Sequence, residues 1–349
     1  GFVASFNSLF WITALSTKNP SLDNEVEVAK ILKQISPTHV VSFIGRTHGP
    51  GYSTIDYLEL PGKLKDNVCD NLYAPLTLAI QCSKLNIHYT YLGTGCIFLA
   101  DDPTRSSYNE DALPDFFGSS YSVVKGYTDR LMHNFNDSVL NVRIRMPITA
   151  DYNPRNFITK ITTYNKVCSI PNSMTVLPEL LPIMIKMMES KKVGTINLTN
   201  PGVISHNEIL EMYRETVNPE FTWKNFTIEE QDKILASKRS NNYLSTEKLE
   251  LKYNIPNIKD SIKNIMIKRT ILIEAISKTS TKEELSLAST IWARPYQPVK
   301  RLTKIANTKE TPSGNPTANW RTHFFFARRL FSQYTKNSFS SSASIALQI

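Results

Sequence analysis

Glycine, cysteine and long apolar runs are all scarce in this sequence of 349 residues. None of its 12 glycines lies between residues 2 and 44, so that stretch has no glycine-rich loop. Its four cysteines form no Cys-x-x-Cys pair and have no histidine at metal-ligand spacing, which argues against a disulfide framework and against a bound metal. The most apolar stretch, residues 177–188, is broken by two prolines and two charged residues, and it is shorter than the roughly 18 residues of a membrane span. We therefore expect a protein of a reducing compartment, the cytoplasm, with no membrane segment.

Acidic residues are scarce toward the C-terminus, and this accounts for most of the formal charge of +9. Residues 271–349 hold 11 basic and 4 acidic side chains, a net of +7, which leaves only +2 for residues 1–270. A nearly neutral body argues against nucleic acid as a partner. The remaining composition is that of an ordinary globular protein, with 41% hydrophobic and 20% charged residues, so the chain can bury a sizeable core.

Short β-branched runs alternate with helical periodicity in the first 200 residues. Four runs read as strands that end in glycine, proline or asparagine, at residues 38–44, 88–92, 139–145 and 194–198. A helix over residues 66–83 is predicted to pack on the sheet through a four-residue stripe of Val68, Leu72, Leu76 and Ile80. A second helix is predicted over residues 120–135. Strands and helices that alternate at this spacing indicate an α/β fold with a doubly wound parallel sheet.

The sequence divides into three predicted regions. Residues 1–150 would form a dinucleotide-binding core, and residues 151–277 a smaller, mostly helical substrate-binding lobe interleaved with the last strands. In that lobe Ser205 and Glu208 form a capping box that predicts a helix through Thr216, with His206 as an exposed helix-start residue, and residues 228–236 form another short helix. Residues 278–349 are basic and serine-rich and are predicted to be a poorly ordered extension.

The sharpest chemical pattern is Tyr121 and Lys125, which lie four apart on a predicted helix and so can point into one site. A phenol is a poor acid at neutral pH unless a cation stabilises its phenolate, and Lys125 can supply that cation. Thr94 and Cys96 follow a predicted parallel strand, at the end where ligands bind in open α/β sheets. On the residues alone, Thr94 could equally be a turn residue and Cys96 a small buried hydrophobe.

Around these positions the sequence resembles the bifunctional nucleotide-rhamnose synthases, which are epimerase-reductases of the RmlD-like branch of the extended short-chain dehydrogenase/reductases. The resemblance covers roughly residues 25–262. It is carried by nine segments: IGRTHG from Ile44, YLGTGCIF from Tyr91, FFGSSY from Phe116, NVRIRMP from Asn141, RNFITK from Arg155, IPNSM from Ile170, LTNPG from Leu198, SHNE from Ser205 and RSNN from Arg239.

The resemblance implies an NAD(P)-binding Rossmann fold and an NADPH-dependent enzyme, with NADH the less favoured cofactor. Its activity would be the conversion of UDP- or dTDP-4-keto-6-deoxyglucose to the L-rhamnose nucleotide. Thr94, Tyr121 and Lys125 would catalyse the reduction at C4. Cys96 and Lys160 would move protons at C3 and C5, which needs groups on opposite faces of the sugar.

Binding roles are also implied by the resemblance. The cofactor would contact the catalytic pair and the residues Gly45, Arg46, Thr47, His48, Pro147 and Ile148. The nucleotide sugar would contact Cys96 and Lys160 together with Asn156, Phe157, Arg239 and Asn242. Without the family context, Lys160 and Arg239 would read as exposed helix cations.

One departure from the family pattern concerns the cofactor loop. A dinucleotide fold opens with a strand and a glycine fingerprint that accepts the pyrophosphate. The spacing to Arg46 leaves Gly1 and Ala4 as its remnant, so we expect an N-terminally incomplete Rossmann fold whose first strand is missing, with a helix and the second strand compressed into residues 5–17. Such a sheet would expose a central edge.

Three functions therefore remain open. The first is the epimerase/reductase, the second a 4-reductase in which Cys96 and Lys160 are bystanders, and the third a non-catalytic fold relative that serves as a regulatory binding module. A homodimer is expected, and the choice between UDP and dTDP is open.

Overall fold

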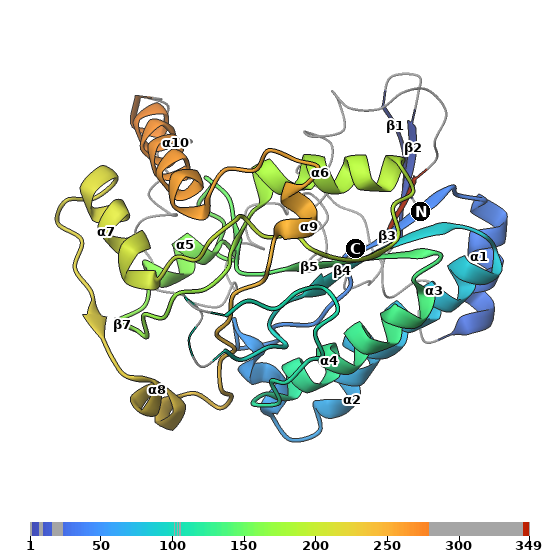
Figure 1. Ribbon diagram of the computed structural model, residues 1–349, viewed down its shortest axis with the longest axis horizontal. Coiled ribbons are helices and arrows are strands. Elements are labelled where there is room, and N and C mark those ends of the chain that lie inside the picture. The colour runs from blue at the N-terminus through green and yellow to red at the C-terminus, as the bar shows by residue number, and fades with distance from the viewer. Residues whose placement is uncertain are drawn as a thin grey trace, which may run out of the picture.

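A seven-stranded sheet runs through the centre of the molecule (Figure 1). The computed structural model describes residues 2–6, 10–15, 24–100, 102, 104, 106–278 and 345–348. The strand order is β1-β2-β11-β3-β4-β5-β9, and every neighbouring pair is parallel except β1 with β2. The predicted parallel α/β fold is confirmed.

The four predicted strands all occur in this sheet. They are β3 (His39–Ser42), β4 (His88–Thr94), β5 (Val139–Ile144) and β9 (Gly194–Asn197). Almost every residue in them is buried, because helices cover both faces of a parallel sheet. Since these strands are parallel, the loops after β3, β4 and β5 meet at one edge of the sheet.

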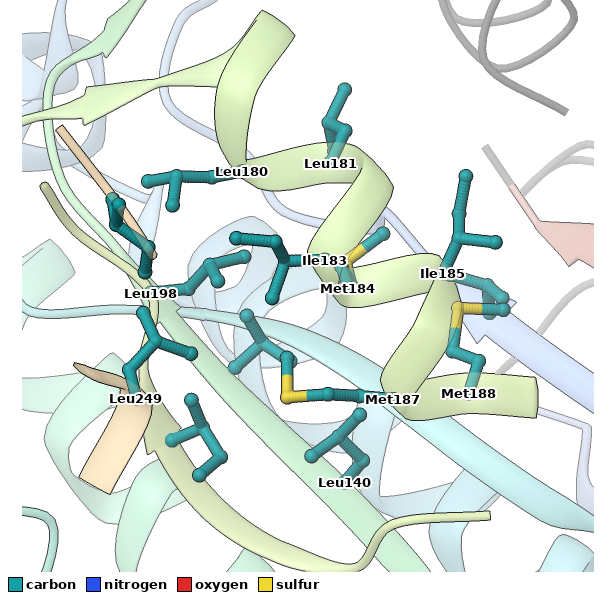
Figure 2. Close-up of a cluster of buried hydrophobic side chains, with 14 residues drawn as sticks. Leu140, Leu180, Leu181, Ile183, Met184, Ile185, Met187, Met188, Leu198 and Leu249 are labelled. Atoms are coloured by element: carbon teal, nitrogen blue, oxygen red, sulfur yellow. The ribbon is translucent and has the colours of Figure 1, made fainter. Parts of the chain in front are cut away.

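Two layers of helices enclose the sheet (Figure 1). On one face lie α1 (Glu25–Ile35), α3 (Ala74–Lys84) and α4 (Ser120–Met132), followed by the short 3-10 helix η3 (His133–Phe135). On the other face lie α6 (Leu177–Glu189) and α9 (Glu247–Glu250). Figure 2 shows side chains of α6 packed among Leu140, Leu198 and Leu249. The most apolar stretch of the sequence is therefore a helix against the sheet. Among the helices that the structure describes, none has the length and apolar character that crossing a bilayer requires.

The helix predicted over residues 66–83 forms, but it buries a different face. It consists of α2 (Leu64–Val68), the π-helical turn η2 (Cys69–Tyr73) and α3. The predicted stripe from Val68 to Ile80 is only partly buried, whereas Asn67, Asn71 and Leu78 are buried. The prediction of the face was wrong because the two asparagines satisfy their amides inside the protein. Asn71 Nδ2 donates to Asn67 Oδ1 at 2.8 Å, and Asn67 Nδ2 donates to Ser120 Oγ at 2.9 Å.

The N-terminal part of the sheet differs from the expectation. Instead of a helix and a strand between residues 5 and 17, the chain forms β1 (Phe2–Phe6) and β2 (Phe10–Leu15), which pair antiparallel. The expected exposed central edge is also absent, because β11 (Ile345–Gln348) lies between β2 and β3 and is parallel to both. Four residues of the predicted poorly ordered extension are thus a strand, and residues 279–344 and 349 lie outside the described residues.

The second half of the chain builds a separate core beside the sheet. Its elements are β6 (Pro147–Ile148), α5 (Phe157–Ile161), β7 (Lys166–Val167), β8 (Thr175–Val176), α7 (His206–Thr216), β10 (Lys224–Asn225), α8 (Ile228–Ile234) and α10 (Ile258–Lys278). The predicted capping box is confirmed at α7: Ser205 Oγ accepts from Glu208 N, and Glu208 Oε2 accepts from Ser205 N. Side chains from α5, α7 and α10 fill one apolar cluster, which is distinct from the clusters on the two faces of the sheet.

Candidate active site

Thr94, Tyr121 and Lys125 meet at the carboxyl end of β4. Thr94 is the last residue of β4, and the other two lie one turn apart on α4. All three are buried, and the hydroxyl groups of Tyr121 and Thr94 are hydrogen-bonded. Burial raises the pKa of the Tyr121 phenol, an effect that its hydrogen bond to Thr94 opposes. A buried phenol of this kind can keep its proton until a cation or a developing negative charge draws it away.

The beginning of α4 is held firmly, which places Tyr121. Ser119 is the N-cap, and its Oγ accepts from Ser122 N at 3.0 Å. Glu59, at the end of the 3-10 helix η1 (Ile55–Glu59), accepts from Ser120 N at 2.7 Å. A carboxylate at a helix N-terminus also matches the positive end of the helix dipole.

Lys125 is an ammonium group inside the protein. Burial lowers its pKa to about 7, against the charges of Asp129 and Cys96, which raise it. Its Nζ donates to the Tyr91 hydroxyl and lies 4.6 Å from the centre of that ring. A Cβ atom placed on Gly45 would lie 3.9 Å from the same Nζ, so the amine sits directly beneath the loop that follows β3.

Cys96 belongs to the same group of side chains. Its backbone N donates to Thr94 Oγ1 at 3.1 Å, and its partly exposed side chain packs against a cluster that contains Tyr57 and Tyr121. Its charge acts on the pKa of Tyr121 and of Lys125. The two interpretations of Thr94 are therefore compatible, because its hydroxyl accepts a turn hydrogen bond and also meets Tyr121.

Arg145 and Asn242 donate hydrogen bonds to the backbone carbonyls of the loop that carries Cys96. Arg145 Nη1 donates to Gly95 O at 2.9 Å, and Asn242 Nδ2 donates to the carbonyls of Gly95 and Phe98, both at 2.9 Å. Both side chains are fully buried. Asn242, a predicted substrate contact, therefore stabilises the backbone of this loop. Arg145 was not among the predicted site residues, although it lies in the NVRIRMP segment.

A cluster of positive charge lies at the other side of the site. Burial lowers the pKa of Lys160, and the charges of Arg155 and Arg239 lower it further. Arg239 is paired with Asp56, with Nη2 2.6 Å from Oδ2 and Nη1 3.3 Å from Oδ1. This pairing uses the end of the guanidinium, and among the described residues no acceptor meets its Nε–H, so the Nε edge suits an anion. The sequence pattern did not predict Asp56, which is 183 residues away.

Two predicted residues near α5 have local roles. Asn156 is the N-cap of α5, the helix that carries Lys160, and its Oδ1 accepts from Ile158 N at 3.1 Å. Its amide also donates to Thr149 and Asp151, which commits both of its hydrogens. Phe157 contacts His206 edge to face, with ring centres 5.3 Å apart. His206 was predicted to be exposed, and that was wrong: burial under this contact lowers its pKa to about 4.

The predicted cofactor residues divide into two groups. Gly45, Arg46, Thr47 and His48 follow β3, and Asn71 clamps Arg46 by accepting from its N and donating to its O, both at 3.0 Å. Pro147 and Ile148 form β6 after β5, and Ile148 is fully buried. Gly1 lies outside the described residues, and Ala4 lies within β1, paired with Ile12, instead of in a strand-to-helix turn.

These residues fit the nicotinamide end of a dinucleotide. Lys125 is a buried ammonium that no carboxylate in the described part of the chain neutralises at ion-pair distance, so its hydrogens suit the hydroxyls of a ribose. The pyrophosphate end is less complete. Among the described residues, no strand leads through a glycine fingerprint directly into a helix. No group of three or more histidine, cysteine or acidic side chains is arranged for a metal ion in this part of the chain either.

Comparison with known proteins identifies the family. Protein L780 of Acanthamoeba polyphaga mimivirus is 56% identical over 250 residues, which are 70% of this chain and 86% of L780. The crystal structure of the L780 UDP-rhamnose synthase superposes with a TM-score of 0.71 at 48% identity, covering 75% of this chain and 100% of that one. The chain belongs to the nucleotide-rhamnose synthase family.

Other relatives agree with this assignment. A bifunctional dTDP-4-dehydrorhamnose 3,5-epimerase/reductase of Arabidopsis thaliana is 42% identical over 266 residues, 75% of this chain and 85% of the plant protein. The chain spans only 36% of a trifunctional Arabidopsis UDP-rhamnose enzyme to which it is 44% identical over 69% of its own length. A dTDP-4-dehydrorhamnose reductase of Bacillus anthracis, at 17% identity and a TM-score of 0.60, shares the fold. No family model matches the chain. The resemblance found in the sequence is confirmed.

Proposed function

We propose that this chain is an NADPH-dependent 3,5-epimerase/4-reductase that converts UDP- or dTDP-4-keto-6-deoxyglucose to the L-rhamnose nucleotide. The observation that supports this most is the meeting of Thr94, Tyr121 and Lys125 with Cys96 at one strand end, in a chain 56% identical to L780. Reduction requires Thr94, Tyr121 and Lys125, and epimerisation also requires Cys96.

In the reduction, Tyr121 protonates the oxygen that develops at C4. Thr94 holds that oxygen through its hydroxyl, and Lys125 stabilises the phenolate that remains. NADPH, when bound, supplies the hydride. The family relation favours NADPH over NADH, and the Lys125 ammonium would hold the nicotinamide ribose.

In the epimerisation, Cys96 and Lys160 exchange the protons at C3 and C5. The C4 carbonyl makes these protons acidic, and the contacts that hold its oxygen also stabilise the enolate. Burial and two neighbouring guanidinium groups lower the pKa of Lys160, so its amine can give up a proton more easily than a solvated lysine. That property suits a group that must act as both acid and base.

The nucleotide diphosphate would bind at Arg239. Asp56 orients the guanidinium and leaves its Nε edge open, and Lys160 adds a second positive charge nearby. A guanidinium fork matches two phosphate oxygens, so this edge would set the position of the sugar relative to Tyr121.

A homodimer would use the outer faces of α4 and of the helix formed by α2, η2 and α3. The apolar stripe from Val68 to Ile80 on that helix is only partly buried, and Tyr127 on α4 is 59% exposed. An apolar face of this kind favours association. Sedimentation of the wild type and of Tyr127→Asp tests it: the wild type should sediment as a dimer and the variant as a monomer.

The direct test of the function is to incubate the purified chain with the 4-keto-6-deoxyglucose nucleotide and NADPH. We expect NADPH absorbance to fall and NMR to show a rhamnose-configured product. A product reduced at C4 with its C3 and C5 configuration unchanged would favour the 4-reductase. Tight binding of the nucleotide sugar with no consumption of NADPH would favour the binding module.

A further inference from the structure

Among the described residues, no carboxylate lies at ion-pair distance from the buried ammonium of Lys125. Asp129, the carboxylate whose charge acts on it, is held by Arg143 Nη2 at 2.7 Å and by Asn141 Nδ2 at 2.8 Å. Its charge therefore acts on Lys125 from a distance. An ammonium buried in this way costs free energy unless its hydrogens find acceptors.

Tyr91 supplies that acceptor. It lies on β4 three residues before Thr94 and is 1% exposed. Its hydroxyl accepts from Lys125 Nζ, and the amine also lies over the ring, 4.6 Å from its centre. One of the three N–H hydrogens of Nζ is thus used in a hydrogen bond to Tyr91. The other two are available for other acceptors, such as the ribose hydroxyls of the cofactor.

We propose that Tyr91 is a positioning residue of the reduction. Its hydroxyl accepts a hydrogen bond from Lys125 Nζ and so fixes the position of the ammonium that assists Tyr121. The catalytic consequence rests on the proposed function, whereas the contact itself does not. Because Tyr91 and Thr94 share one strand, β4 sets the positions of both the cation and the hydroxyl that assist Tyr121.

Several other groups around Lys125 must stay unchanged in a test. The charges of Asp129 on α4 and of Cys96 in the loop after β4 act on it, Tyr121 lies one turn earlier on α4, and Gly45 lies close to its Nζ. Tyr91→Phe leaves all of them in place and removes one oxygen. It keeps the ring under the ammonium, so the packing of the strand is preserved.

Tyr89 provides a matched control on the same strand. It lies two residues earlier and is also fully buried, but it is Ser42 on β3, and not Lys125, that acts on its hydroxyl. Tyr89→Phe therefore removes the same buried atom from the same face without touching Lys125.

The experiment titrates Lys125 directly. The chain is labelled with [ε-13C]lysine, the Lys125 signal is assigned with Lys125→Arg, and its midpoint is followed by NMR in the wild type and both variants. In Tyr91→Phe we expect a lower titration midpoint of Lys125, because the ammonium has lost an acceptor, and in Tyr89→Phe no change.

At pH 7 the turnover number of Tyr91→Phe should fall about tenfold, the scale of one hydrogen bond to a charged group, with little change in KM for the sugar. The loss should deepen as the pH rises.

Equal Lys125 midpoints in the wild type and Tyr91→Phe would overturn the proposal, even if activity fell. A wild type that consumes no NADPH would refute the proposed function, and the titration would still decide whether Tyr91 holds Lys125. A second measurement needs the wild type alone: with [ζ-13C]tyrosine, the Tyr91 signal should shift as Lys125 titrates, and the Tyr89 signal should not. No shift at Tyr91 would also overturn the proposal.

Discussion

At the scale of single residues, the proposed function makes Tyr121 the proton donor for the reduction, and its buried phenol, bonded to Thr94, suits that role. Tyr121→Phe should lower the turnover number between about a hundredfold and ten-thousandfold, the usual contribution of a positioned acid. Tyr127→Phe, on the exposed side of the same helix, is the control and should keep wild-type activity. The rate of NADPH oxidation measures both, and a Tyr121→Phe rate near wild type would contradict this role.

Cys96 should matter for one half-reaction only. Cys96→Ala should still reduce an epimerised 4-keto substrate but should no longer invert C3 and C5, because inversion needs two groups on opposite faces of the sugar and only Lys160 remains. Deuterium incorporation in D2O, followed by NMR, reports the exchange separately from reduction. Cys69→Ala on η2 is the control. A rhamnose-configured product from Cys96→Ala would show that a residue other than Cys96 completes the inversion.

The contacts that sequence reasoning missed join residues that lie far apart in the chain. Arg145 and Asn242 reach the loop of Cys96 across 50 and 147 residues, and Asp56 reaches Arg239 across 183. Local spacing does not reveal such pairs. Tyr121 and Lys125 were predictable because their geometry is contained within one helix turn.

At the scale of elements, β3 and β4 are joined by the paired residues His39 and His88 (ring centres 5.2 Å apart). His39 Nε2 bonds to the carbonyl of Met188 near the end of α6. Burial lowers the pKa of His39 to about 4, and the charge of His88 adds to that effect. Both histidines therefore remain neutral in the folded protein at a pH where the unfolded chain takes up protons.

This predicts that the protein loses stability in mild acid. Because the folded pKa of His39 is below the unfolded value, its contribution is fully present above about pH 6.5 and is lost as the pH falls toward 4, by about 3 kcal/mol. His39→Gln cannot take up the proton, so its free energy of unfolding should fall less over this range. Urea unfolding at pH 7 and pH 4.5 measures the difference. Equal losses in the two proteins would contradict the assignment.

The elements themselves were predictable where burial follows hydrophobicity. Strands β3, β4, β5 and β9 are buried on both faces, so their β-branched runs stand out. The helix over residues 66–83 was placed correctly but turned to the wrong face, because Asn67 and Asn71 are buried through hydrogen bonds that hydropathy does not register. The strand β11 lies more than 300 residues from its partner β3, and no local sequence pattern predicts such a pairing.

At the scale of the whole molecule, the ion pair of Asp56 and Arg239 joins the sheet half to the second lobe. Arg239→Lys keeps the charge but loses the fork, so KM for the nucleotide sugar should rise about tenfold while the turnover number changes little. Arg214→Gln, which removes a cation beside Trp223, is the control and should leave KM unchanged. An unchanged KM in Arg239→Lys would mean that the diphosphate binds elsewhere.

The central claim is that one site performs both epimerisation and reduction. The most direct measurement is NMR of the product formed in D2O from the 4-keto-6-deoxyglucose nucleotide and NADPH. We predict an L-rhamnose nucleotide with deuterium at C3 and C5 and with hydrogen from NADPH at C4. A reduced product that retains protium at C3 and C5 would contradict the account.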